Sequence, residues 1–254
     1  MSDHEARPWY ETAFGLDYLE RYAHRDSSEA HLAIASLVEP LGLVRTSRVL
    51  DLACGPGRHS LPLAERYPAT VSFDLSAPLL AAARGTLEAA GHRPACVRGD
   101  MRQLPFGAES FQLVVNFFTA FGYFDPDEEN LAVFAEVRRV LAHGGWFLFD
   151  FLNEAVVRRS IEPVDFLPER GAVVRTTRRV TPPPERIEKR VERLVDGRAE
   201  LLSEESVRFF RPEELRLGLR AARFDIAAEF GGYGGGAFDP GASARWIALA
   251  RARP

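Results

Sequence analysis

The sequence predicts a doubly wound α/β fold, in which helices cover both faces of a mostly parallel sheet. The first observation is an apolar run over residues 49–52 that ends in the glycine turn Gly55-Pro56-Gly57 and continues as a helical pattern. The second is a pair of further apolar runs, residues 70–73 and 95–97, with a helical stretch between them. Strand, tight turn and helix in this order form the first crossover of a doubly wound sheet.

Length and composition limit the classes of protein that fit. A chain of 254 residues with 46% apolar content suits one α/β domain with additions. A net charge of −4 provides no broad basic surface, so we expect no nucleic-acid partner. Two cysteines are too few for a disulfide framework, and we expect both to be buried. No signal peptide or membrane-length apolar run is apparent, so we predict a cytoplasmic protein without a membrane partner.

Residues 1–43 are expected to form N-terminal helices. Phe14, Tyr18 and Tyr22 recur at helical spacing, so they should share one face of a helix. That face is either a packing stripe or a lid over a bound ligand. A second amphipathic helix over residues 31–43 leads into the first strand.

Residues 44–160 are expected to form the core of the domain. Ser76 is a typical N-cap with a proline in the following turn, and Asp125-Pro126 has the same character. The expected helices cover residues 76–91 and 125–144, and the expected strands cover residues 111–115 and 146–151.

The pattern changes over residues 161–211. Three strand-like segments without helices, residues 172–180, 186–195 and 198–210, predict an antiparallel β insertion. Residues 212–254 then predict a helix and a closing antiparallel strand pair. No linker is long enough for a second domain, so we expect a single domain from residue 1 to residue 254.

An acid follows or ends each of three successive predicted strands: Asp51, Asp74 and Asp100. Asp74 follows Gly57 by 17 residues, close to the ~20 typical of an acid that binds ribose hydroxyls. Ligands of open α/β sheets bind at the carboxyl ends of the strands, where these acids should meet. A dinucleotide-binding loop would carry a third glycine, but this chain has Ser60 there.

Five motifs in this order resemble those of the class I S-adenosylmethionine-dependent methyltransferases, in particular a bacterial small-molecule branch with an antiparallel β insertion. They are Val49 to Gly57, Phe73 to Ser76, Gly99 to Met101, Phe111 to Phe124 and Val140 to Phe147. The resemblance implies a Rossmann-like sheet of seven strands, an N-terminal helical lid and S-adenosylmethionine as cofactor, with S-adenosylhomocysteine as product.

The resemblance also assigns the cofactor site. Asp51 would orient the glycine turn or the amino group of the cofactor, Asp74 would bind the ribose hydroxyls, and Asp100 would accept from the adenine amino group. The full set of implied cofactor-binding residues is Tyr18, Asp51, Ala53, Cys54, Gly55, Gly57, Asp74, Leu75, Asp100, Met101, Asn116 and Phe117.

The implied reaction is an in-line displacement at the methyl group of a sulfonium, which mainly requires alignment and exclusion of water. We expect no metal. The candidate acceptor-binding residues are Tyr10, Phe118, Phe121, Tyr123, Tyr233 and Arg245, a set that suits a small, partly apolar molecule. The sequence identifies no general base, although His59 closely follows the glycine turn.

Two other functions stay open at this point: an oxidoreductase of the NAD type, and a non-catalytic cofactor-binding module. Residues 116–119 lack the Asp/Asn-Pro-Pro-Tyr motif of amino-directed nucleic-acid and glutamine methyltransferases. The acceptor atom, N, O or C, is undetermined, and the protein is expected to be a monomer or a homodimer.

Overall fold

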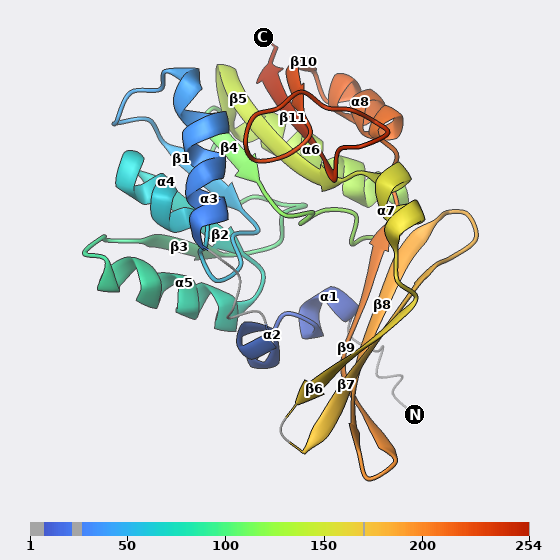
Figure 1. Ribbon diagram of the computed structural model, residues 1–254. Helices are drawn as coiled ribbons and strands as arrows, with labels where there is room; N and C mark the ends of the chain where they lie inside the picture. The colour runs from blue at the N-terminus through green and yellow to red at the C-terminus, as the bar shows by residue number, and fades with distance from the viewer. Residues whose placement is uncertain (1–7, 22–26, 170, 254) are drawn as a thin grey trace, which may run out of the picture.

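The structure is a computed structural model that describes residues 8–21, 27–169 and 171–253. Its largest element is a seven-stranded sheet with the order β10-β11-β5-β4-β1-β2-β3 (Figure 1). β11 runs antiparallel to both of its neighbours, and the other pairs are parallel. The strands are β1 (Val49–Leu52), β2 (Thr70–Asp74), β3 (Ala95–Arg98), β4 (Phe111–Asn116), β5 (Leu141–Leu152), β10 (Phe224–Phe230) and β11 (Arg245–Ala252). The prediction of a doubly wound, mostly parallel seven-stranded sheet is confirmed.

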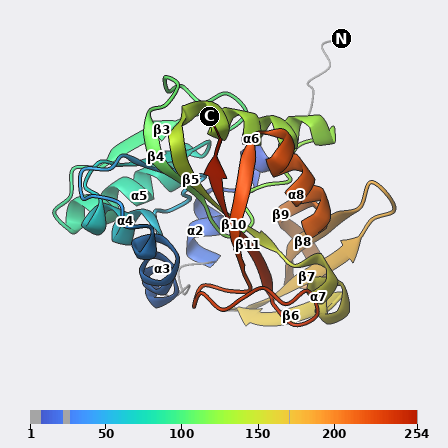
Figure 2. The same ribbon diagram turned by 90° about the horizontal axis from the view of Figure 1, so that it is seen from above.

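Helices cover both faces of this sheet (Figure 2). They are α3 (Ser27–Ala33), α4 (Ser60–Arg66) and α5 (Ala77–Ala89) on one side, and α6 (Asp127–Val140) and α8 (Pro212–Ala221) on the other. Successive strand residues alternate between the two cores: Val49 packs with α3 and α4, whereas Leu50 packs with α6 and α8. A parallel strand covered on both faces is shielded from water along its length, and β1 is accordingly buried at every position, Asp51 included.

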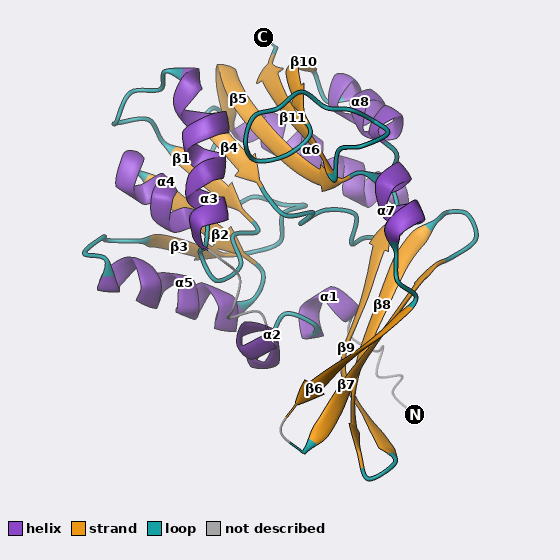
Figure 3. Cartoon of the chain, viewed as in Figure 1, coloured by secondary structure: helices purple, strands orange, loops and turns teal. Residues whose placement is uncertain are grey.

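A second sheet projects from the core (Figure 3). It is antiparallel, with the order β6-β7-β8-β9. Its strands are β6 (Val164–Glu169), β7 (Ala172–Val180), β8 (Arg186–Val195) and β9 (Arg198–Arg208). Three of these strands match the predicted segments of the insertion. β6 was not predicted, because Asp165 and Pro168 interrupt its apolar pattern, and only its pairing with β7 makes it a strand.

The junction between α6 and β5 differs from the prediction. α6 begins at Asp127, two residues after the expected N-cap Asp125, and it ends at Val140. β5 follows immediately, so that Gly144 and Gly145 lie inside the strand instead of ending the helix. A Cβ on Gly145 would lie 2.9 Å from the Ala142 carbonyl oxygen, where the register of β4 against β5 shifts. Gly144 and Gly145 therefore allow an irregularity within β5. A pair of glycines is equally typical of the end of a helix, so the sequence pattern does not distinguish the two.

The N-terminal segment also differs from the prediction. It forms two short helices, α1 (Trp9–Thr12) and α2 (Leu16–Arg21), and Phe14 lies in the break between them. Tyr22, the third member of the predicted stripe, lies outside the described residues. α3 begins at Ser27, earlier than expected, and continues as a wide helical turn over Ile34–Val38 and a short 3-10 helix over Glu39–Leu41.

One helix was not predicted at all. α7 (Glu154–Ser160) follows β5, and Asn153 caps it by accepting a hydrogen bond from the Ala155 N–H at 3.3 Å. Cys54 is buried as expected, but Cys96 is only half-buried, because β3 is the edge strand of the large sheet. Among the described residues, no helix is long and apolar enough to span a membrane.

Candidate functional site

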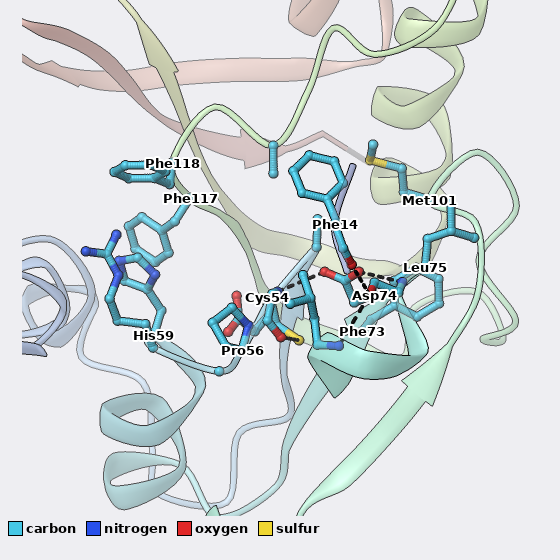
Figure 4. Close-up of a pocket in the computed structure, with 18 of the residues that line it drawn as sticks. Phe14, Cys54, Pro56, His59, Phe73, Asp74, Leu75, Met101, Phe117 and Phe118 are labelled. Atoms are coloured by element: carbon cyan, nitrogen blue, oxygen red, sulfur yellow. Dashed lines mark hydrogen bonds between the residues drawn. The ribbon is translucent and has the colours of Figure 1, made fainter. Parts of the chain in front are cut away.

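A cavity of about 550 Å³ lies at the carboxyl ends of β1, β2 and β4. Its wall contains the glycine turn after β1, the ends of the neighbouring strands, and side chains from α1 and α2. Figure 4 shows Asp74 and Leu75 at one end and His59, Phe117 and Phe118 at the other, with Cys54 and Pro56 between them. The cavity is therefore elongated. We call the end beside Asp74 the polar end and the end beside Phe117 and Phe118 the aromatic end.

The glycine turn has a backbone that few side chains could adopt. Ala53, Gly55 and Gly57 all have φ in the left-handed region, at 57°, 56° and 83°. A Cβ on Gly57 would lie 2.8 Å from the Cβ of Ala83, so glycine is required there for α5 to approach. The turn is thus fixed by its own conformation and by packing beneath it.

Asp74 connects this turn to the start of α5. Its Oδ2 accepts the Gly55 N–H at 2.8 Å, and its Oδ1 accepts the Ser76 N–H at 2.8 Å. Burial raises the pKa of Asp74, although the backbone hydrogen bonds from Ser76 and Gly55 oppose the increase. An ionised carboxylate offers about four acceptor positions, so both oxygens keep capacity for a ligand in the cavity.

Asp51 is almost completely buried beneath the turn. Its Oδ2 accepts the Ser60 hydroxyl at 2.6 Å, and Ser60 in turn accepts the Ser72 hydroxyl at 2.9 Å. Burial is the main reason that the pKa of Asp51 rises to about 7; the Ser60 hydrogen bond opposes this rise and the nearby Asp74 charge adds to it. Ser60, which replaces the third glycine of a dinucleotide-binding loop, therefore has a function of its own as the partner of Asp51.

Asp100 and Met101 lie in the wall together with Tyr10 and Phe124. The Asp100 carboxylate forms an ion pair with Arg102, whose Nη2 lies 2.6 Å from Oδ2. Nothing in the sequence pattern marks Arg102, because an arginine two residues after an acid is an ordinary local pair.

The N-terminal helices close one side of the cavity. Phe14 and Tyr18 line it, and their rings meet edge to face with centroids 5.3 Å apart. The Ser76 hydroxyl donates to the Phe14 carbonyl at 2.6 Å, and Arg21 donates to the Ser203 hydroxyl of β9 at 2.9 Å. These contacts connect the N-terminal segment to the start of α5 and to the β insertion, respectively.

The loop after β4 forms the aromatic end. Phe117 and Phe118 lie in the wall, and Phe118 and Thr119 both have φ in the left-handed region, at 62° and 61°. Such conformations are costly for residues other than glycine and persist only where the surroundings hold them. Here Asp150 of β5 holds them, because its Oδ2 accepts the Phe118 N–H at 2.7 Å and its carbonyl accepts the Thr119 N–H at 3.1 Å.

His59 stacks on Phe117, with ring centroids 4.1 Å apart. Burial, reinforced by the charges of Arg58 and Arg245, lowers the pKa of His59 to about 3. The imidazole is therefore neutral over the physiological pH range.

Most of the predicted site residues gather at this cavity. Of the twelve predicted cofactor-binding residues, eleven line it. The exception is Asn116, whose Nδ2 donates to the carbonyls of Leu52 and Ala120 at 3.0 and 3.2 Å and so joins the end of β1 to the loop after β4. Of the predicted acceptor residues, Tyr10, Phe118 and Tyr123 line the cavity.

The other three predicted acceptor residues do not line it. Phe121 is core, stacked on Phe134 with centroids 4.7 Å apart. Tyr233 and Arg245 both bond the buried Asp150 carboxylate, Tyr233 through its hydroxyl at 2.6 Å. Arg245 also donates to the Thr119 hydroxyl at 2.9 Å. Tyr233 and Arg245 therefore support the strained loop from behind. Within the described residues, no cluster of His, Cys, Asp or Glu could hold a metal ion.

Comparison with known proteins identifies a methyltransferase domain in this chain. Residues 49–145 match the family model described as a methyltransferase domain. A demethylmenaquinone methyltransferase of Thermus thermophilus is 39% identical over 100 residues, which cover 39% of this chain and 44% of the relative. A dTDP-3-amino-3,4,6-trideoxy-alpha-D-glucopyranose N,N-dimethyltransferase of Streptomyces venezuelae is 35% identical over 162 residues, which cover 58% and 63%. The chain thus spans roughly half the length of these relatives.

Solved structures extend the likeness over almost the whole chain. An S-adenosylmethionine-dependent methyltransferase from Clostridium acetobutylicum superposes with a TM-score of 0.78 at 19% identity, covering 94% of this chain and 96% of that one. The CcbJ methyltransferase from Streptomyces caelestis gives a TM-score of 0.79 at 22% identity, covering 96% and 99%. The chain therefore carries a methyltransferase domain on the class I S-adenosylmethionine-dependent methyltransferase fold, and the resemblance of its motifs to that family is confirmed.

Proposed function

We propose that this protein is an S-adenosylmethionine-dependent methyltransferase that acts on a small molecule. The observation that carries the proposal is the convergence of Asp51, Asp74 and Asp100 with the glycine turn on one cavity. Three independent strand ends supply these acids, and the match to a methyltransferase domain favours this class over an NAD-type oxidoreductase.

The wall fits the cofactor group by group. Asp74 keeps acceptor capacity for the two ribose hydroxyls after its backbone bonds are made. Leu75 and Met101 supply apolar surface for adenine, beside the Asp100 carboxylate. The Gly55–Gly57 turn, with Asp51 beneath it, lies where the methionine part would extend towards the aromatic end.

When bound, the cofactor supplies a methyl group on a sulfonium that is already an activated leaving group. The protein then has to place the acceptor in line with that methyl and exclude water. The aromatic faces of Phe14, Tyr18 and Phe117 suit this task, because ring quadrupoles attract a cation and the rings displace solvent.

The aromatic end of the cavity is the place for the acceptor. Phe118 lies at this end, where the Arg58 guanidinium is 4.9 Å from the centroid of its ring. The other two predicted acceptor residues in the wall lie elsewhere along the cavity, Tyr10 against Phe124 and Tyr123 against Phe14. This wall favours a small, partly apolar acceptor. The names of the curated relatives include a demethylmenaquinone, an amino sugar nucleotide and a malonyl-acyl-carrier protein, so the shared domain does not select one acceptor.

The setting of the protein is part of the proposal. The net charge of −4 supports the absence of a nucleic-acid partner, and we place the protein in the cytoplasm as a monomer or homodimer.

Isothermal titration against S-adenosylhomocysteine and against NAD tests the cofactor. We expect the first to bind and the second not to bind; the reverse result would assign an oxidoreductase. A panel of small amines, phenols and quinols with S-adenosylmethionine, monitored by release of S-adenosylhomocysteine, then tests turnover. Cofactor binding without release on any acceptor class would favour the non-catalytic module.

A further inference from the structure

Arg102 makes more contacts with the Asp100 carboxylate than a surface ion pair needs. Its Nε lies 3.1 Å from each carboxylate oxygen, and its Nη2 lies 2.6 Å from Oδ2. The backbone N–H of Arg102 also donates to Oδ1 at 2.8 Å. The carboxylate is thus held by both the main chain and the side chain of one residue.

The guanidinium itself is held on two further sides. Its Nη1 pairs with Glu129 in the first turn of α6. Its Cζ lies 4.2 Å from the centroid of the Phe124 ring and 6.0 Å from that of Tyr10. Tyr10 and Phe124 meet edge to face at 5.2 Å, and both line the cavity. A planar guanidinium packed against a buried ring has little freedom to rotate.

This arrangement fixes the orientation of the Asp100 carboxylate at the cavity wall. The terminal torsion of an aspartate is broad, so an unsupported carboxylate samples many planes. The fork of Arg102 fixes one plane. Burial alone would raise the pKa of Asp100, but the hydrogen bonds from Arg102 outweigh burial and lower it. Three N–H groups of Arg102 donate hydrogen bonds to the Asp100 carboxylate. Because a carboxylate offers about four acceptor positions, one position is left for a ligand.

We propose that Arg102 is a positioning residue, which orients the Asp100 carboxylate so that the cavity recognises the exocyclic amino group of the cofactor's adenine. The proposal rests on the proposed function, because it takes Asp100 as the adenine acid. It adds a residue whose side chain acts through Asp100, with Glu129 and Phe124 as its supports.

The test compares two ligands that differ by the amino group alone: S-adenosylhomocysteine and its 6-desamino analogue, which carries purine in place of adenine. Their dissociation constants are measured by titration with the full chain. The variants are Arg102→Gln, which removes the fork, and Arg102→Lys, which keeps the charge. Arg139→Gln is the matched control, because Arg139 forms an equally close pair with Glu136, at 2.7 Å, outside the cavity wall.

We expect the wild type to prefer S-adenosylhomocysteine by about 10-fold or more, the effect of a hydrogen bond to a charged group. In Arg102→Gln the preference should fall to about 3-fold or less, while the desamino analogue binds as in the wild type. Arg102→Lys should lie between them, and Arg139→Gln should keep the full preference.

An unchanged preference in folded Arg102→Gln, or an equal loss of both ligands, overturns the proposal. If Arg102→Gln does not fold, Arg102→Lys decides in the same way: a full preference overturns the proposal and a reduced preference supports it. A wild type that binds both ligands equally removes Asp100 as the adenine acid and overturns it too. A wild type that binds neither ligand refutes the proposed cofactor itself, a result distinct from the others.

Discussion

Replacement of Asp74 by alanine should weaken both the fold and the cofactor site, by amounts that can be worked out from its contacts. The side chain is 9% exposed and accepts the N–H groups of Gly55 and Ser76, each at 2.8 Å. Asp74→Ala removes both acceptors at once. It also removes the carboxylate proposed to bind the ribose hydroxyls.

A hydrogen bond to a charged group contributes about 1.5–3 kcal/mol. The variant also removes a buried carboxylate whose pKa is raised by burial, which offsets part of the loss. We therefore expect the free energy of unfolding to fall by about 2–3 kcal/mol. The affinity for S-adenosylhomocysteine should fall by about 1–3 kcal/mol, because the ribose hydroxyls lose their acceptor.

Urea unfolding measures the first quantity and isothermal titration the second. Asp225→Ala is the control, because Asp225 also lies near a strand end and pairs with Arg253, but its side chain is 63% exposed. It should change neither quantity appreciably. A folded Asp74→Ala protein that binds S-adenosylhomocysteine with wild-type affinity would refute the ribose assignment. Unchanged stability would refute the role of Asp74 in holding the turn.

Three further predictions concern other parts of the site. Because the pKa of Asp51 is raised to about 7 in the folded protein, its contribution to stability should be fully present below about pH 4 and lost as the pH rises to 7. Asp51→Asn should remove this slope from urea unfolding between pH 5 and 8, and parallel profiles would contradict it. Tyr233→Phe should lower the free energy of unfolding by about 1.5–3 kcal/mol, since Asp150 loses a 2.6 Å hydrogen bond; no loss would show that the hydroxyl contributes nothing net. We predict that residues 8–25 form a mobile lid over the cofactor. This segment includes α1 and α2, which have no buried residue, while residues 22–25 lie outside the described residues. Hydrogen exchange over residues 9–21 should slow when S-adenosylhomocysteine binds, and deletion of residues 1–25 should leave a folded core that binds it more weakly; equal exchange in both states would make these helices a fixed wall.

The core of the fold and the polar end of the site could be predicted from the sequence alone. The turn after β1 requires glycine because its backbone has positive φ, and a requirement of that kind is visible in the residues themselves. Asp51, Asp74 and Asp100 could be assigned to one site because the carboxyl ends of parallel strands meet at one edge of a sheet. Both inferences need only local chemistry and a known strand order.

Only the tertiary structure decided which aromatic and charged residues face the cavity. Tyr233 and Arg245 carry the residue types of a binding site, but Asp150 holds both of them behind the loop after β4. The same contacts explain how Phe118 and Thr119 keep a left-handed backbone. These residues lie on segments that are far apart in the chain, and the pairing of β11 with β5 brings them together. A sequence pattern records the period and the turn chemistry of each segment, whereas the side of a loop that a distant side chain supports depends on strand pairing, which no local pattern encodes.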